Sequence, residues 1–194
     1  MKKYINTQGV TLVEAMVALG VLGILLSIAA PSFADLLNQR RVQMIAAELS
    51  TDLAFARSQV VLRSGPDAEV TVYFKQLDNM SCYTIAYYGG AGYCDCSNGP
   101  SVACLGSQIP EIKTTQVSRS GGVSFVASGT PNRGLNQRTA DRVTFTWPQL
   151  TADPSNFSVV ISGIRGSSLR VQVNGMGRIE TCAPNGNFNG YKSC

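Results

Sequence analysis

The first part of the chain is a long run of apolar residues behind a short polar leader. From Val10 to Ala34 the only charged residue is Glu14. The run covers 25 residues, and about 20 apolar residues are enough to cross the hydrocarbon core of a bilayer. We therefore expect residues 1–9 to form a leader and residues 10–34 to form a hydrophobic transmembrane helix.

The helical pattern continues beyond the apolar run. Apolar residues recur at intervals of three and four, which is the period of an α-helix. They are Leu36, Leu37, Val42, Ile45, Leu49, Leu53, Ala56 and Val60, whereas Arg40, Arg41, Glu48, Asp52 and Arg57 are expected on the other faces. The pattern predicts an amphipathic continuation over residues 35–64, which Ser64-Gly65-Pro66 ends. Because Pro31 lacks an amide hydrogen, we expect it to bend or loosen the helix and so to be a helix break.

Beyond Pro66 the pattern becomes that of short strands separated by glycine-rich turns. The expected strands are residues 70–74, 82–88, 123–126, 142–147, 157–161 and 169–173, with a short one at 177–181. No helical pattern interrupts them, so the sheets should be antiparallel. We therefore expect an α+β fold in which residues 65–194 form a globular β domain, packed on the second half of the long helix.

Composition indicates an exported, anchored protein. Charged residues make up only 14% of the chain, which favours β-structure with many turns over a charged helical bundle. An even number of cysteines downstream of an apolar segment indicates disulfides formed in an oxidising compartment. The six cysteines are Cys82, Cys94, Cys96, Cys104, Cys182 and Cys194.

The positions of the cysteines narrow their possible pairing. Cys182 and Cys194 stand far from the other four and should close the C-terminal segment, while the first four lie close together and should pair among themselves. Cys94 and Cys96 are too close for an easy mutual bridge, so each should reach outward to one of the other two, in some order. Zinc is the alternative for this cluster, but Cys94-Asp95-Cys96 lacks the usual two-residue spacing and the chain has no histidine.

The leader has an unusual relation to the apolar run. Its plausible cleavage point, after Gly9, lies before the run, whereas an ordinary secretory signal is cut after its apolar region. With the basic Lys2-Lys3, the segment Thr11-Leu12-Val13-Glu14 and Pro31, this arrangement resembles the prepilin signal of type IV pilins and of the pseudopilins of type II secretion. One departure is that Val10 stands where the family most often has Phe. A plain N-terminal membrane anchor is the alternative.

The resemblance implies a sequence of processing steps. A prepilin peptidase would cleave between Gly9 and Val10 and methylate the new α-amino group of Val10. The subunit would be stored in the inner membrane as a single-pass protein and then be extracted into a helical filament.

The presence of Glu14 needs an explanation, because placing a carboxylate in hydrocarbon costs free energy and such a residue usually has a function. The resemblance implies that Glu14 meets the N-terminal amine of a neighbouring subunit. In low dielectric that pairing would be strong and would fix the axial register of the helices. The alternative is a helix-end glutamate that reaches the lipid headgroups.

Further resemblance lies on the predicted spine and at the C-terminus. The segments Ala54-Phe55-Ala56-Arg57-Ser58, 174–182 and 190–194 resemble minor type IV pilins of the FimT and FimU type, which are related to GspH-type pseudopilins. The resemblance implies the type IV pilin fold and a structural subunit that is present in few copies, primes filament assembly and sits at or near the tip. Its partners would be other major and minor pilins. A type II secretion pseudopilin, with a periplasmic pseudopilus, and a major pilin are alternatives.

A DNA-binding minor pilin is a further alternative. Some FimT relatives bind DNA through a Gly-Arg-x-Arg motif, and this chain has Gly177-Arg178-Ile179-Glu180, with an acid in place of the second arginine. From Lys113 to Cys194 there are nine basic and three acidic residues, and Arg133, Arg138, Arg142, Arg165 and Arg170 are among them. On one face they could hold phosphates. Between weak DNA binding and contact with the acidic part of a neighbouring subunit, we favour the subunit contact.

An enzyme is not indicated. The chain has no histidine, no pair of acids at catalytic spacing and no nucleophile motif. The glycine-rich segment Gly89-Gly90-Ala91-Gly92 has no following helix or lysine, so it is a poor phosphate cradle. We expect no cofactor and no metal.

Overall fold

The computed structural model describes residues 11–63, 65, 68–88, 92–104, 109–129, 141–186 and 188–194, apart from the side chains of residues 29–31. The chain divides into two compact units, Met1–Leu37 and Asn38–Cys194, which are described separately. The expected leader and cleavage position at Gly9 and Val10 lie outside the described residues, as do Arg133 and Arg138.

One helix, α1, runs from Leu12 to Arg63, close to the expected bounds. Position 31 is helical, as are its neighbours on both sides, so α1 does not end at Pro31, and the expected bend or loosening there stays a prediction. A proline removes one backbone donor and bends a helix more readily than it stops one.

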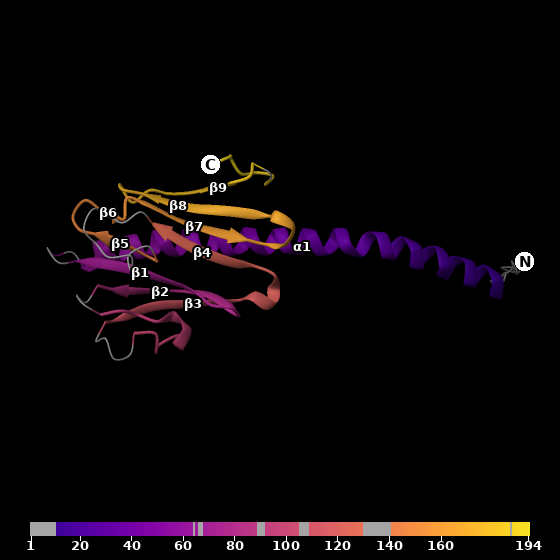
Figure 1. Ribbon diagram of the computed structural model, residues 1–194, viewed down its shortest axis with the longest axis horizontal. Coiled ribbons are helices and arrows are strands. Elements are labelled where there is room, and N and C mark those ends of the chain that lie inside the picture. The colour runs from indigo at the N-terminus through magenta and orange to yellow at the C-terminus, as the bar shows by residue number, and fades with distance from the viewer. Residues whose placement is uncertain are drawn as a thin grey trace, which may run out of the picture. The chain divides into compact units, whose positions relative to one another are not determined.

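Two antiparallel sheets make up most of the second unit (Figure 1). One has five strands in the order β3–β2–β1–β5–β6, and the other has four in the order β4–β7–β8–β9. The strands are β1 Glu69–Gln76, β2 Met80–Tyr87, β3 Glu111–Ser118, β4 Ser124–Gly129, β5 Arg142–Thr146, β6 Thr151–Asp153, β7 Asn156–Ser162, β8 Ser168–Asn174 and β9 Ile179–Cys182. The predicted α+β fold, a long helix packed on antiparallel sheets with disulfides, is confirmed.

Two strands, β3 and β6, were not predicted. β3 is an edge strand of the five-stranded sheet and its residues are half-buried or exposed, so it has no apolar alternation to identify it. Its threonines suit a pleated surface, but they lie among lysine, glutamine and glutamate. β6 has only three residues, which is too short for a period to be recognised.

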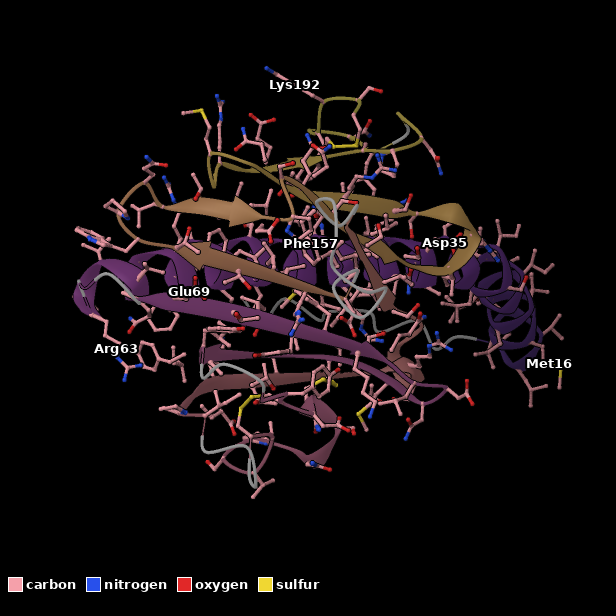
Figure 2. All side chains as sticks on the ribbon, turned by 60° about the vertical axis from the view of Figure 1, so that its left-hand side comes forward. Met16, Asp35, Arg63, Glu69, Phe157 and Lys192 are labelled. Carbon is pink, nitrogen blue, oxygen red and sulfur yellow. A yellow bond between two sulfur atoms is a disulfide. The ribbon has the colours of Figure 1, made fainter. Side chains whose placement is uncertain are left out.

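The core of the second unit lies between the helix and both sheets. The buried face of α1 consists of Val42, Ala46, Leu49, Leu53, Ala56 and Val60. Strand residues from both sheets complete the cluster, including Phe74 of β1 and Phe157 of β7, whose rings are 5.3 Å apart. Figure 2 shows Phe157 near the middle of this unit. Because the apolar stripe of α1 faces both sheets, one helix closes the whole core.

A second, smaller cluster covers the other face of the five-stranded sheet. It contains Tyr73, Ala86, Cys94, Cys104 and Ile109. Three of these residues belong to the connection between β2 and β3, which therefore lies over the sheet and makes β1 buried on both faces.

Candidate functional site

The start of α1 is set by Thr11. Its Oγ1 accepts a hydrogen bond from the Glu14 backbone N–H at 3.3 Å, and its carbonyl oxygen accepts one from the Ala15 N–H at 3.1 Å. Thr11 is thus the N-cap residue of the helix and Glu14 is at N3. A carboxylate in the first turn also interacts favourably with the helix dipole. The hydrogen bond uses the Glu14 backbone, and the Glu14 carboxylate suits the first turn through its charge, a preference that Thr-x-x-Glu signals and the sequence reasoning missed.

The apolar surface of the first unit is exposed. Leu12, Leu19 and Ile28 are 72%, 68% and 68% exposed. An 18-residue window of α1 near its N-terminus has a mean hydropathy of 2.4, and none of that window is buried within the chain. By length and composition the helix could cross a membrane. Lipid or other helices would have to cover this surface in the cell.

A buried carboxylate joins α1 to the five-stranded sheet. Asp52, expected on a polar face, is only 7% exposed. It accepts a hydrogen bond from the Tyr83 hydroxyl at 2.6 Å and forms an ion pair with Lys113 Nζ at 2.6 Å. Burial, and secondly the hydrogen bond to Asp52, raise the pKa of Tyr83. The sequence did contain a signal for this buried role, because Asp52 lies between Leu49 and Leu53 on the apolar stripe. A charged group that is buried there needs hydrogen-bond or ion-pair partners.

The cysteine cluster is stapled by two disulfides. Cys82 of β2 bonds to Cys96 of η1 (Cys96–Asn98), and Cys94 bonds to Cys104. Cys94 and Cys96 therefore bond to Cys104 and Cys82 and not to each other, which gives the pairing that the spacing left open. Cys82–Cys96 holds the connection between β2 and β3 against the sheet, and Cys94–Cys104 closes a loop within that connection.

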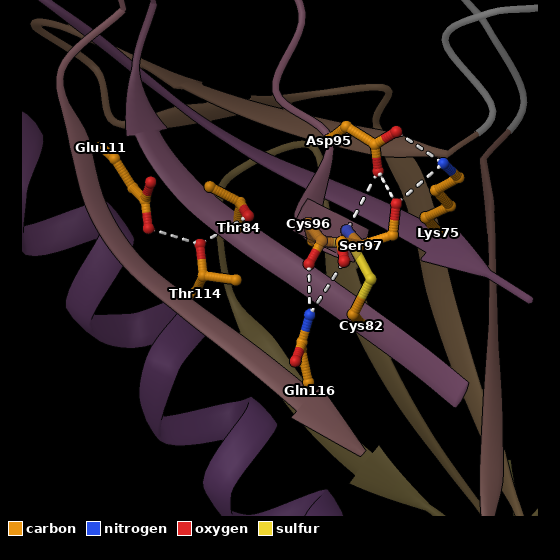
Figure 3. The surroundings of a disulfide bond; sticks show 9 residues. All are labelled: Lys75, Cys82, Thr84, Asp95, Cys96, Ser97, Glu111, Thr114 and Gln116. Carbon is orange, nitrogen blue, oxygen red and sulfur yellow. Dashed lines mark hydrogen bonds and ion pairs between the residues drawn. A yellow bond between two sulfur atoms is a disulfide. The ribbon is translucent and has the colours of Figure 1, made fainter. Parts of the chain in front are cut away.

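Polar contacts fix the same connection (Figure 3). Lys75 Nζ lies 2.6 Å from Asp95 Oδ2, and the Asp95 carboxylate also accepts from the backbone N–H of Ser97 at 3.0 Å. Gln116 Nε2 donates to the Cys96 carbonyl oxygen at 2.8 Å. Partial burial acts to raise the pKa of Asp95, but the hydrogen bonds from Lys75 and Ser97 outweigh it and lower that pKa. These contacts pin the connection to β1 and β3.

The third disulfide joins Cys182 to Cys194 and closes the C-terminal loop. Phe188 of this loop is buried in the main core, and its ring meets that of Tyr191 edge to face at 5.7 Å. Lys192 points away from the domain (Figure 2). The loop is thus a fixed, exposed surface feature with an apolar anchor.

A polar groove of about 290 Å³ crosses β7, β8 and β9. Arg170 and Arg178, two of the three arginines considered for DNA contact, line it together with Glu180. Arg178 Nε lies 2.9 Å from Glu180 Oε1, so the acid that replaces the second arginine of the relatives' motif neutralises the first. The groove therefore has less positive charge than its arginines suggest.

The third arginine, Arg165, lies in η4 (Ile164–Gly166) between β7 and β8 and is not among the residues that line this groove. It has a left-handed backbone with φ of 54°. The structure therefore does not gather the three arginines into this one groove.

Comparison with known families finds one match. The model of the prokaryotic N-terminal methylation motif matches residues 5–30. No curated protein and no solved structure matches the chain. The matched residues include Gly9, Val10 and Glu14 and lead into the exposed apolar helix. The motif indicates a type IV pilin or pseudopilin, a structural subunit that is processed by a prepilin peptidase and assembles with other pilins.

Proposed function

We propose that the chain is a minor type IV pilin that primes filament assembly and sits at the filament tip. The observation that carries this proposal is the methylation motif at residues 5–30 ahead of a helix whose apolar surface is exposed. Lipid would cover that surface before assembly, and the helices of neighbouring pilins would cover it afterwards. The tip role rests on the resemblance of the C-terminal segments to minor pilins.

Processing would produce the assembling form. A prepilin peptidase cleaves between Gly9 and Val10, removes the leader of residues 1–9 and methylates Val10. Residues 10–34 are then the membrane and filament-core helix, residues 35–64 its amphipathic continuation, and residues 65–194 the globular domain.

Glu14 would pair with the methylated amine of Val10 in a neighbouring subunit. Its place at N3, in the first turn of α1, offers a competing role as a helix-capping side chain, and two substitutions separate the roles. Glu14→Gln suits the N3 position of a capping box but has no charge, whereas Glu14→Val lacks both features. If pairing dominates, both variants should enter sheared filaments poorly, measured by immunoblot against membrane levels.

A matched control removes the N-cap hydroxyl of Thr11 and keeps the charge of Glu14. Thr11→Val deletes the hydroxyl that accepts from Glu14 N–H and should leave incorporation near the wild-type level. Normal incorporation of Glu14→Gln, together with a defect in Thr11→Val, would replace the pairing role with a capping role.

The tip role is tested by copy number and by deletion. Immunogold labelling should place the protein at filament ends, and deletion of its gene should reduce piliation. Label along the whole filament would support the major-pilin alternative. Loss of protein secretion with normal piliation would support the type II secretion alternative.

DNA binding is a second candidate, favoured by the groove that holds Arg170 and Arg178. Because Arg178 forms an ion pair with Glu180, we expect weak binding of DNA. Glu180→Arg should strengthen binding and steepen its decrease with salt, and Arg178→Gln should weaken it. Gel-shift titrations at two salt concentrations would measure this.

A further inference from the structure

The outer face of the four-stranded sheet is polar but carries little charge. The buried residues of β7 and β8, such as Phe157 and Val171, belong to the main core. Because successive side chains of a strand point to opposite faces, Ser158, Arg170 and Gln172 lie on the outer face. Strands β4, β7 and β8 together contain a single charged residue, Arg170. This face therefore offers neutral hydrogen-bonding groups around one arginine.

These groups form a row across the polar groove. Ser158 pairs with Gln172, and Gln172 pairs with Glu180, so a hydroxyl, an amide and a carboxylate cross β7, β8 and β9 in register. Figure 1 shows these three strands side by side. Direct cross-strand neighbours are about 5 Å apart, a spacing that neighbouring hydroxyl groups of one ligand can bridge. Asn156 and Asn174 pair in the next row on the same face and also line the groove.

Arg170 has an unused donor in this groove. Its side chain is half-buried, and its Nε is buried without a hydrogen-bond partner among the described residues. Buried polar groups nearly always have a partner, so this exception calls for an explanation. A guanidinium presents a planar fork of donors that matches the two oxygens of a carboxylate. A carboxylate bound in the groove would supply the acceptor that Arg170 lacks.

The remaining charges of the groove cancel. Of the three charged residues that line it, Arg178 and Glu180 form an ion pair at 2.9 Å, which leaves Arg170 as the one uncompensated charge. Binding of nucleic acid by charge draws on several phosphates at once. A ligand with one negative charge fits this groove better than a nucleic-acid strand does.

The rest of the lining indicates a ligand rich in hydroxyl groups. The apolar residues that line the groove are Phe157 and Val173, and each is only 1% exposed. Sites for drug-like molecules are mostly apolar, and peptide grooves usually offer apolar pockets. Amides and hydroxyls both donate and accept, as the hydroxyls of a sugar do. At about 290 Å³, the groove is near the lower limit of ligand pockets, about 300 Å³, so the bound unit is small.

We propose that the polar groove binds a hexuronic acid unit of an acidic saccharide, with the sugar carboxylate on Arg170 and its hydroxyls on Ser158 and Gln172. This inference goes beyond the proposed pilin role and does not depend on it, because every residue of the groove lies in the second unit. On a filament, the site would bind an acidic polysaccharide outside the cell.

The test measures binding of digalacturonic acid to the full chain in a detergent that has no sugar headgroup, by saturation-transfer NMR and by titration. The methyl ester of the same disaccharide is the matched ligand, because it keeps the hydroxyls and loses the charge. We expect the acid to bind and the ester to bind at least about tenfold more weakly, since hydrogen bonds to a charged group are worth that much.

Substitutions then locate the site. Arg170→Gln should weaken binding of the acid at least about tenfold and should leave Tm near the wild-type value, because the lost Nε donor has no partner. Gln172→Glu places a second acid in the row beside Glu180 and should weaken binding as well. Arg178→Gln should have a much smaller effect, because Glu180 already neutralises that arginine. Arg40→Gln is the matched control, because Arg40 is an exposed arginine of α1 outside the groove, and it should leave binding unchanged.

Absence of binding, or equal binding of acid and ester, would overturn the proposal. Acetate that competes as well as the disaccharide would show a general carboxylate site, which also overturns it. A single-stranded oligonucleotide that binds more tightly than the disaccharide, with a larger loss in Arg178→Gln than in Arg170→Gln, would assign the groove to DNA instead. None of these results bears on processing or filament assembly, so the pilin proposal is tested separately.

Discussion

Replacing Asp52 tests how the helix is tied to the five-stranded sheet. In Asp52→Ala the Tyr83 hydroxyl, in a residue only 1% exposed, loses a charged acceptor at 2.6 Å. Loss of such a partner costs about 1–3 kcal/mol. Lys113 is 39% exposed, so solvent screens the ion pair that it loses, and that loss adds less than about 1 kcal/mol. We therefore expect the free energy of unfolding to fall by about 2–3 kcal/mol.

The assay is thermal unfolding of the full chain in mild detergent with its disulfides intact, followed by near-ultraviolet circular dichroism. The expected loss corresponds to a decrease in Tm of about 4–12 °C. Asp52→Asn keeps an acceptor oxygen and should lose less. Glu48→Ala is the matched control, because Glu48 is a more distant and half-exposed partner of Lys113 at 3.8 Å, and it should cost less than about 0.5 kcal/mol.

A double-mutant cycle gives the refuting result. Tyr83→Phe removes the hydroxyl that Asp52→Ala leaves without its acceptor, so the double variant should be more stable than the sum of the two single losses predicts. Strict additivity, or a loss in Asp52→Ala no larger than that in Glu48→Ala, would show that the buried hydrogen bond does not contribute as described.

Two further predictions concern the disulfide-bonded connection and the C-terminal loop. Peptide mapping of the non-reduced protein should recover Cys82–Cys96, Cys94–Cys104 and Cys182–Cys194, and a free thiol or a Cys94–Cys96 bond would contradict this. Because the pKa of Asp95 is lowered from 3.8 in the folded chain, its ionised form stabilises the fold above that pH, and the contribution is lost as the pH falls through the lower folded value. Asp95→Asn should therefore be less stable than the wild type at neutral pH and lose less stability on acidification, measured by Tm against pH. An unchanged pH profile would show that the ionised Asp95 carboxylate does not stabilise the fold through Lys75 and Ser97.

The main elements of the fold could be predicted because their apolar periods are strong. The helix stripe from Val42 to Val60 and the alternating strands β7 and β8 are examples. Strand β3 could not be predicted, because its residues are half-buried or exposed on both faces. Its position comes from its pairing with β2. The period of apolar residues in a sequence reflects which positions are buried, so an edge strand that buries few side chains has no clear period.

The polar contacts were the hardest to predict. Asp52 and Asn38 both lie on α1, and their partners are distant in sequence, for example Lys113 and Ile164. A periodic pattern shows that such a residue falls near the buried stripe but not which group will satisfy it. The order of the bonds in the cysteine cluster was open for the same reason, because it depends on how the connection between β2 and β3 lies over the sheet.

The central claim is that the chain is processed at Gly9–Val10 and assembled as a pilin. Mass spectrometry of the N-terminal peptide, taken from protein in sheared filaments of cells that have a prepilin peptidase, tests it most directly. The account predicts a chain that starts at Val10 and carries a methyl group on its α-amino nitrogen. An intact leader with Lys2-Lys3 in assembled filaments would contradict it.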